Sequence, residues 1–255
     1  MRETDRHVAA VMAALQTLDA FESGEKLRLS QLHERTGLAR SRLLRLTGTL
    51  EAAGYLVLDS ATSLYELGPK VYRLAWLAKD ALDGLAKLLR PRLAKLTATT
   101  EATAFFSVAR GDQRLVIAKS EPDEGIRYTI SEGQLRPLHV GATGAVLLAY
   151  GPPERLARVL QQEQLAAVTP ATITDPKVLA ERVNQVARSG IASSLGEGTH
   201  EAYACAVPVH DPRGRFVGAM TIAGPTSVLT RDRSFYEAQL LEEAKHLSTR
   251  VLDTP

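Results

Sequence analysis

The sequence predicts an α+β fold in which an N-terminal winged helix-turn-helix is followed by a linker helix and a C-terminal α/β domain. Three observations carry this prediction. Two short amphipathic helices flank a glycine-containing turn near residue 37 and precede two short β-rich segments. A longer stretch of helical periodicity begins at Gly68-Pro69. From residue 103 onward, strand and helix patterns alternate along the chain.

The first two helices of the expected winged helix-turn-helix are marked by periodicity and end signals. Residues 5–21 are expected to form a helix because apolar side chains recur at helical spacing on one face: Val8, Val11, Met12, Leu15, Leu18 and Phe21. Ser-Gly at 23–24 interrupts this pattern. Ser30 is the expected N-cap of a short second helix. That helix should end at Gly37, since glycine adopts a positive φ without strain.

The third helix and the wing complete the predicted domain, residues 1–68. The helix is expected from about Ser41 to Ala53 and ends at Gly54 for the same reason as its predecessor. Tyr55–Leu58 and Leu64–Leu67 alternate like two short strands joined by a polar connection. A helix-turn-helix followed by a hairpin is a winged helix.

The remainder of the chain is expected to divide into a linker helix, residues 69–100, and an α/β domain, residues 101–255. Pro91 should kink or break the linker helix. Strands are expected over 103–109, 114–120, 126–130, 202–210 and 216–223, and helices over 144–150, 154–162, 176–188 and 231–251. Asp175 and Thr230 are the expected N-caps of the last two helices, and Asp211–Gly214 forms a turn.

The formal net charge of +2 is small, but the charge is unevenly distributed. Residues 26–45 contain six basic residues and one acid, Glu34, and residues 69–100 contain seven bases against two acids. Residues 101–255 contain 16 bases and 18 acids. A polyanion responds to local positive charge rather than to the sum over the chain, so the N-terminal part suits DNA.

The third helix has the pattern of a recognition helix. Leu43, Leu46, Leu50 and Ala53 recur as a buried stripe, whereas Arg42, Arg45 and Thr49 recur on another face. Arginine can bond guanine O6 and N7 in the major groove. On an isolated helix such a face is usually only solvated, but the neighbouring turn, hairpin and charge favour DNA binding. The predicted double-stranded DNA contacts are Ser30, Arg40, Ser41, Arg42, Arg45 and Thr49.

Several segments together resemble the IclR-type transcriptional regulators over roughly residues 5–250. They are Leu29–Leu46 with Leu50-Glu-Ala-Ala-Gly-Tyr-Leu, the wing exit Tyr65-Glu-Leu-Gly-Pro, the loop Pro137-Leu-His-Val-Gly-Ala-Thr-Gly144, and the strand Val217–Pro225. The chain departs from the family pattern at Ala145, where lysine is common, and at Leu44, where an aromatic residue or histidine is common. The resemblance implies a DNA-binding regulator.

The resemblance also implies that the C-terminal domain is GAF-like, with an antiparallel sheet and a pocket for a small organic or aromatic acid. The implied effector-binding positions are Ala142 and Thr143 in the signature loop, Ser194 near the loop after Ile191, and Ala204, Thr221 and Ala223 on the late strands. From the residues alone, Gly141–Gly144 is either a simple turn and N-cap or a set of amide N–H groups for a carboxylate. Apolar walls are expected from Phe105, Phe106, Leu138 and Cys205.

No catalytic, metal or cofactor site is predicted. Cys205, the single cysteine, is expected to be a small buried side chain rather than a nucleophile. His200 and His210 lack metal-ligand spacing, and His139 is either a buried structural residue or a ligand contact. Gly-x-Ser-x-Gly, Walker and Rossmann motifs are absent from the sequence. With neither a secretory signal nor a run of about 18 apolar residues, a cytoplasmic protein without a membrane partner is expected.

Three hypotheses follow for function. The first is a ligand-responsive regulator that binds a palindromic operator as a homodimer or tetramer, because a two-fold protein matches two half-sites. The second is an enzyme acting on a small carboxylate, with an accessory N-terminal helical domain. The third is an architectural DNA-binding protein that senses no ligand.

Overall fold

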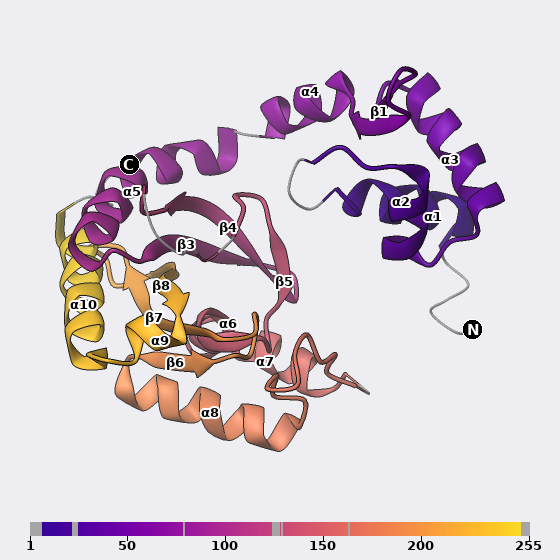
Figure 1. Ribbon diagram of the computed structural model, residues 1–255. Coiled ribbons are helices and arrows are strands. Elements are labelled where there is room, and N and C mark those ends of the chain that lie inside the picture. The colour runs from indigo at the N-terminus through magenta and orange to yellow at the C-terminus, as the bar shows by residue number, and fades with distance from the viewer. Residues whose placement is uncertain are drawn as a thin grey trace. The chain divides into compact units, whose positions relative to one another are not determined.

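The structure, a computed structural model, describes residues 7–21, 25–78, 80–123, 128, 130–162 and 164–250. The chain forms two compact units, Met1–Ala81 and Leu82–Pro255 (Figure 1). Within the described ranges, no helix combines the length and apolar character needed to span a bilayer.

The first unit is the predicted winged helix-turn-helix. Its elements are α1 (Ala9–Asp19), α2 (Leu29–Thr36), α3 (Arg40–Ala52), β1 (Leu56–Asp59), β2 (Leu64–Leu67) and α4 (Pro69–Ala78). The strands β1 and β2 pair antiparallel as the wing. Gly37 and Gly54 have φ values of +67° and +79°, which confirms their expected roles at the ends of α2 and α3. The core of this unit includes Phe21, Leu27, Leu32, Leu43, Leu50, Leu56 and Tyr65.

The start of α2 differs from the prediction. Ser30 lies inside the first turn of the helix, and Arg28 is the N-cap residue. The Gln31 Oε1 atom accepts a hydrogen bond of 2.8 Å from the backbone N–H of Arg28. Because this side chain satisfies the free N–H at the helix start, the helix begins before Ser30 and needs no serine cap.

The burial of side chains on α3 and α1 also differs from what the apolar pattern of the sequence predicts. On α3, Leu43 and Leu50 are buried as predicted, but Leu46 is only half-buried, Ala53 is exposed, and Thr47 is buried in addition. The Thr47 hydroxyl is satisfied inside the unit because it donates to the Leu44 carbonyl at 3.2 Å. On α1 the small inward residues Ala13 and Thr17 are buried, whereas its large apolar side chains are about half or more exposed: Val8, Val11, Met12 and Leu15.

The second unit is built on a six-stranded antiparallel sheet, which agrees with the expected GAF-like domain. Its strand order is β5-β4-β3-β8-β7-β6. The strands are β3 (Thr103–Arg110), β4 (Gln113–Ser120), β5 (Leu135–Pro137), β6 (Ala192–Leu195), β7 (Ala202–His210) and β8 (Phe216–Pro225). The turn Asp211–Gly214 between β7 and β8 is confirmed, and the Asp211 carboxylate accepts from the backbone N–H groups of Arg213 and Arg215.

Helices cover both faces of this sheet (Figure 1). One face packs against α5 (Asp80–Thr100) and α10 (Arg233–Arg250) through side chains such as Leu89, Leu93, Met220, Ile222, Leu240 and Leu247. The other face packs against α6 (Gly141–Ala149), α7 (Pro153–Leu160) and α8 (Pro176–Ser189) through Val146, Val159, Val183, Ala206 and Ala219. A short helix, α9 (Thr226–Leu229), follows β8.

Asp175 caps α8 as predicted, with its carboxylate accepting from the Lys177 N–H at 2.7 Å. Thr230 is not the cap of the last helix, since it follows the C-terminal end of α9. Asp232 takes that role, because its Oδ1 atom accepts from the Phe235 N–H at 3.1 Å.

The predicted linker segment, residues 69–100, is helical on both sides of residue 79, which lies outside the described residues: α4 precedes it and α5 follows it. Pro91 lies within α5, so the helix continues past the residue that was expected to kink or break it. The predicted strand over residues 126–130 falls largely outside the described residues. Tyr128 and Ile130, which are described, are not in a strand.

Candidate functional site

The exposed face of α3 begins with basic and polar side chains. Arg40, Ser41 and Arg45 are exposed, and Thr49 is exposed one turn further along. The Thr49 hydroxyl donates to the Arg45 carbonyl at 2.8 Å. Arg42 is half-buried, and its Nη2 donates to the Ala9 carbonyl at 3.0 Å, so this arginine joins α3 to α1.

An apolar residue lies on the same face of α3. Leu44 is 60% exposed, and residues 41, 44, 45 and 48 are neighbours because they are three or four positions apart. Beside a basic side chain, an exposed leucine is suited to the methyl group of thymine in the major groove. Ser30 lies on α2 and is half-buried, outside this face.

The turn of the wing is acidic. The Asp59 carboxylate accepts hydrogen bonds from the Thr62 hydroxyl at 2.8 Å and the Ala61 N–H at 2.9 Å. The hydrogen bond from Thr62 is the main cause that lowers the pKa of Asp59. A carboxylate in this turn disfavours a DNA phosphate next to it, which leaves α3 as the better surface for DNA in this unit.

All six predicted effector positions lie at the sheet face that α6 covers. The register places Ser194, Ala204 and Ala223 opposite one another across β6, β7 and β8. Thr221 lies two residues before Ala223 on β8, on the same face of the sheet, and pairs with Phe105 on β3. The remaining two positions, Ala142 and Thr143, lie in the first turn of α6.

A hydroxyl pair joins α6 to the sheet in this region. The Thr143 Oγ1 and Thr221 Oγ1 atoms are 2.9 Å apart, and both residues are buried. Ser194, expected near the loop after Ile191, lies in strand β6. A Cβ added to Gly141 would lie 3.6 Å from the Ser194 Oγ, so this serine is next to the start of α6.

The predicted apolar walls divide between the two faces of the sheet. Phe105 and Leu138 lie on the α6 side, whereas Phe106 and Cys205 pack on the α5 and α10 side. The reason is the two-residue period of a strand, which sends neighbouring side chains to opposite faces. Cys205 is fully buried, as expected, and burial raises the pKa of its thiol to about 12. His139 is buried with a ring nitrogen 2.9 Å from the Ala166 carbonyl, which agrees with a structural role.

Two arginines on this face were not singled out from the sequence. Arg114 on β4 is only 4% exposed, and its guanidinium carbon lies 5.7 Å from the centre of the Phe105 ring. Burial lowers its pKa to about 10, so it is still charged at neutral pH. Arg136 lies opposite Arg114 on β5 and donates to the Gly198 carbonyl at 2.6 Å. Strand parity was the available signal, since residue 114 shares a face with the buried Val116.

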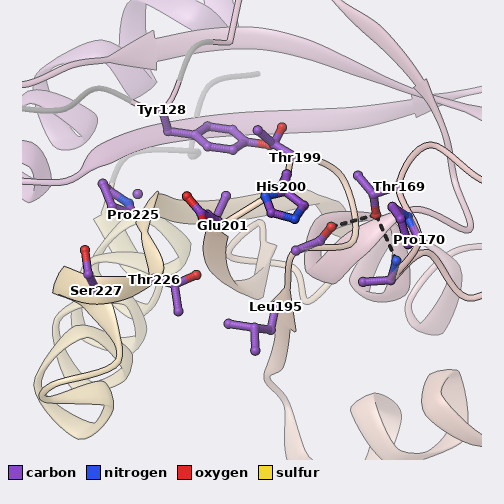
Figure 2. A pocket seen from close by; sticks show the side chains of 14 residues that line it. Tyr128, Thr169, Pro170, Leu195, Thr199, His200, Glu201, Pro225, Thr226 and Ser227 are labelled. Carbon is purple, nitrogen blue, oxygen red and sulfur yellow. Dashed lines mark hydrogen bonds between the residues drawn. The ribbon is translucent and has the colours of Figure 1, made fainter.

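A cavity of about 870 Å³ opens beside this region (Figure 2). Tyr128 lies on one side of it and Leu195 on the other, with Thr199 and His200 near Tyr128. None of the six predicted effector positions lines it. The Tyr128 ring stacks on Phe105 with 6.3 Å between ring centres, so Tyr128 connects the cavity to the α6 face of the sheet.

The comparisons with known proteins agree with both units. A family model described as the bacterial transcriptional regulator IclR C-terminal domain matches residues 81–249, and the IclR helix-turn-helix model matches residues 10–60. The HTH-type transcriptional regulator BhcR of Paracoccus denitrificans is 31% identical over 244 residues, which cover 94% of this chain and 86% of that protein.

Solved structures are similar over the same extent. A transcriptional regulator from Alicyclobacillus acidocaldarius is 30% identical, with a TM-score of 0.70 and coverage of 95% of this chain and 98% of that one. An IclR homologue from Microbacterium hydrocarbonoxydans, complexed with 4-hydroxybenzoate, shares the fold at 21% identity, with a TM-score of 0.73 and coverage of 96% and 100%. The winged helix-turn-helix, the helix-covered antiparallel sheet and these matches together show that the chain belongs to the IclR family of bacterial transcriptional regulators.

Proposed function

We propose that this protein is a cytoplasmic, ligand-responsive regulator that binds a palindromic operator and senses a small organic or aromatic acid. The observation that carries the DNA-binding part is the exposed surface of α3 within a winged helix-turn-helix, where Arg40 is the first residue of the helix and Arg45 follows in its second turn. Arg45 is placed for a base edge in the major groove, and Arg40 and Ser41 for phosphate. Thr49 adds a contact further along α3, whereas Arg42 joins α3 to α1 and Ser30 lies on α2, outside this face.

A homodimer or tetramer is the second part of the proposal. The first unit exposes large apolar side chains on two helices, α1 and α4: Val8, Val11, Met12, Leu15, Tyr72, Leu74 and Leu77. Exposed apolar side chains gathered on one unit favour contact with another chain. Association of two copies through this unit would present two α3 helices to the two half-sites of a palindrome.

The effector site is proposed at the α6 face of the sheet, with Ala142, Thr143, Ser194, Ala204, Thr221 and Ala223 around it. The side chains near the start of α6 are small, and the hydroxyls of Thr143 and Thr221 can bond a polar ligand. The 4-hydroxybenzoate bound by the Microbacterium homologue supports an aromatic acid. The acid changes operator occupancy only if it binds DNA-competent and DNA-incompetent arrangements with different affinity.

Binding of the full-length protein to its own upstream intergenic DNA tests this proposal. We expect a retarded complex that random DNA of equal length competes poorly, that weakens with added salt, and that contains two or four chains by sedimentation. Arg213→Ala serves as the charge-matched control for Arg45→Ala, because Arg213 is an exposed arginine in the second unit. Equal affinity for intergenic and random DNA would contradict a regulator, and turnover of a small carboxylate by the full chain would favour an enzyme instead.

A further inference from the structure

Arg114 is a charged group held in the interior, and no carboxylate of the described residues is paired with it. Its side chain is 4% exposed, and its Nε has no hydrogen-bond partner among the described residues. Among the described residues, the ionisable groups that affect the pKa of Arg114 are the Tyr128 phenol and the Arg136 guanidinium. Neither of them is a carboxylate, and Arg136 repels it.

Such an arrangement is costly unless a further group completes it. Removing a guanidinium from water is unfavourable, and arginine does not escape by losing its proton at neutral pH. The Phe105 ring offers a cation–π contact, which offsets only part of the cost of desolvation. A carboxylate is the group that matches the planar fork of an arginine, because it accepts two parallel hydrogen bonds.

Other polar atoms on the same face are also unpartnered. Thr103, Phe105 and Ser107 alternate on β3 and point to the α6 side, opposite Ala223, Thr221 and Ala219 of β8. Among the described residues, the buried Thr103 Oγ1 and Ser107 Oγ have no hydrogen-bond partner, as is true of the Arg114 Nε. Buried polar atoms normally have partners, so three orphans on one sheet face indicate a site that is completed by a bound polar molecule.

The aromatic pair defines the rest of this site. Phe105 is next to Arg114 and stacks on Tyr128, with an angle of 10° between the two ring planes. Tyr128 also lines the 870 Å³ cavity (Figure 2), so the aromatic pair connects that cavity to the Arg114 guanidinium. A flat apolar body with one carboxylate fits these contacts.

We propose that Arg114 binds the carboxylate of the effector, and that Phe105 and Tyr128 contact its flat, unsaturated body. The effector is thus an aromatic monocarboxylate. This inference rests on the effector site proposed above and adds to it the residue that selects an acid over its neutral analogue.

Isothermal titration of the full-length protein with benzoate, 4-hydroxybenzoate and benzamide tests the role of Arg114. Benzamide has the ring of benzoate without the charge. We expect the wild type to prefer benzoate over benzamide by at least about tenfold, and Arg114→Met to bind both equally, because the charge-assisted pair is lost. Arg110→Met removes a charge from an exposed position on β3 and should keep the wild-type preference.

A second readout separates recognition from a structural role. Without ligand, Arg114→Met should melt at or above the wild-type temperature, because it removes an unpaired buried charge. A melting temperature several degrees lower would instead mean that the charge supports the fold, and would overturn the proposal. Arg114→Lys is a further check, since it keeps the charge without the fork and should reduce the preference for benzoate.

Two results would overturn the inference directly. One is a tenfold preference for benzoate that persists in either Arg114 variant. The other is a wild-type protein that binds neither acid while it still binds its operator; in that case DNA-binding function stands and only the role of Arg114 falls. A protein that also fails to bind operator DNA would mark a failure of the proposed function itself.

Discussion

Gly144 is the position where a single methyl group should disturb the effector site most directly. A Cβ placed on Gly144 would lie 2.0 Å from the Leu138 carbonyl oxygen and 2.8 Å from the Leu138 carbonyl carbon. Ordinary contacts of a Cβ are 3.4–4 Å, so α6 would have to move away from this segment by more than 1 Å. Both partners are backbone, and neither can rotate aside.

The cost of Gly144→Ala follows from this geometry. Overpacking typically destabilises by about 1–3 kcal/mol, and breaking the buried 2.9 Å contact between Thr143 and Thr221 adds about 1–3 kcal/mol. The higher helix propensity of alanine relative to glycine offsets only about 1 kcal/mol of this cost. We therefore expect the free energy of unfolding of the second unit to fall by about 1–5 kcal/mol.

Gly84→Ala is the matched control, since Gly84 also lies in a helix of the second unit and a Cβ there would meet nothing within 4 Å. This substitution should stabilise by about 0.5–1 kcal/mol. Urea unfolding of the two full-length variants, followed by far-ultraviolet circular dichroism, measures the difference. A Gly144→Ala protein as stable as Gly84→Ala, with an unchanged denaturant dependence, would refute the reasoning.

Three further predictions concern DNA, effector and pH. Arg45→Ala should weaken operator binding by about 1–3 kcal/mol in an anisotropy titration if it contacts a base edge, whereas an equal loss on random DNA would place Arg45 on phosphate. Thr143→Trp should abolish the response to benzoate and preserve basal operator binding, because the indole replaces the buried hydroxyl that lies 2.9 Å from the Thr221 Oγ1 atom; a retained response would refute the proposed position of the site. Burial raises the pKa of Cys205 from 9.0 to about 12, so the folded state keeps a proton that the unfolded state releases. The free energy of unfolding should thus be highest below about pH 9 and decrease towards pH 12, and the decrease should be shallower in Cys205→Ala. Thermal melts over this pH range measure the decrease, and an equal decrease in the two proteins would contradict the prediction.

The sequence was informative where structure depends on local pattern. Periodicity and end signals located the helices and the hairpin of the first unit, and Gly37, Gly54 and Asp175 perform the roles expected of them. Ser30 was misplaced because a competing residue, Gln31, satisfies the helix start equally well. Local signals rank candidates for a cap, but tertiary context selects one of them.

The candidate site was harder to predict from the sequence because it depends on pairing between strands that are far apart in the chain. The resemblance placed Thr143 and Thr221 in one pocket, and the structure has their hydroxyls in contact across 78 residues of sequence. Arg114 could have been found only by combining strand parity with knowledge of which face is covered. The strand β6, which contains Ser194, is four residues long and carries too few side chains for a reliable alternating pattern.

The alternation along β8 has a consequence for how a bound acid is communicated. Thr221 and Ala223 face the proposed effector, while Met220 and Ile222 of the same strand pack in the core shared with Leu89 and Leu93 of α5. The proposed effector and α5, the helix that follows α4 in the chain, thus lie on opposite sides of the same strand. A displacement of β8 by the bound acid would reach α5 directly, without a long chain of intervening side chains. Substitutions that uncouple sensing from DNA release, without weakening either, should therefore cluster at the reverse side of β8.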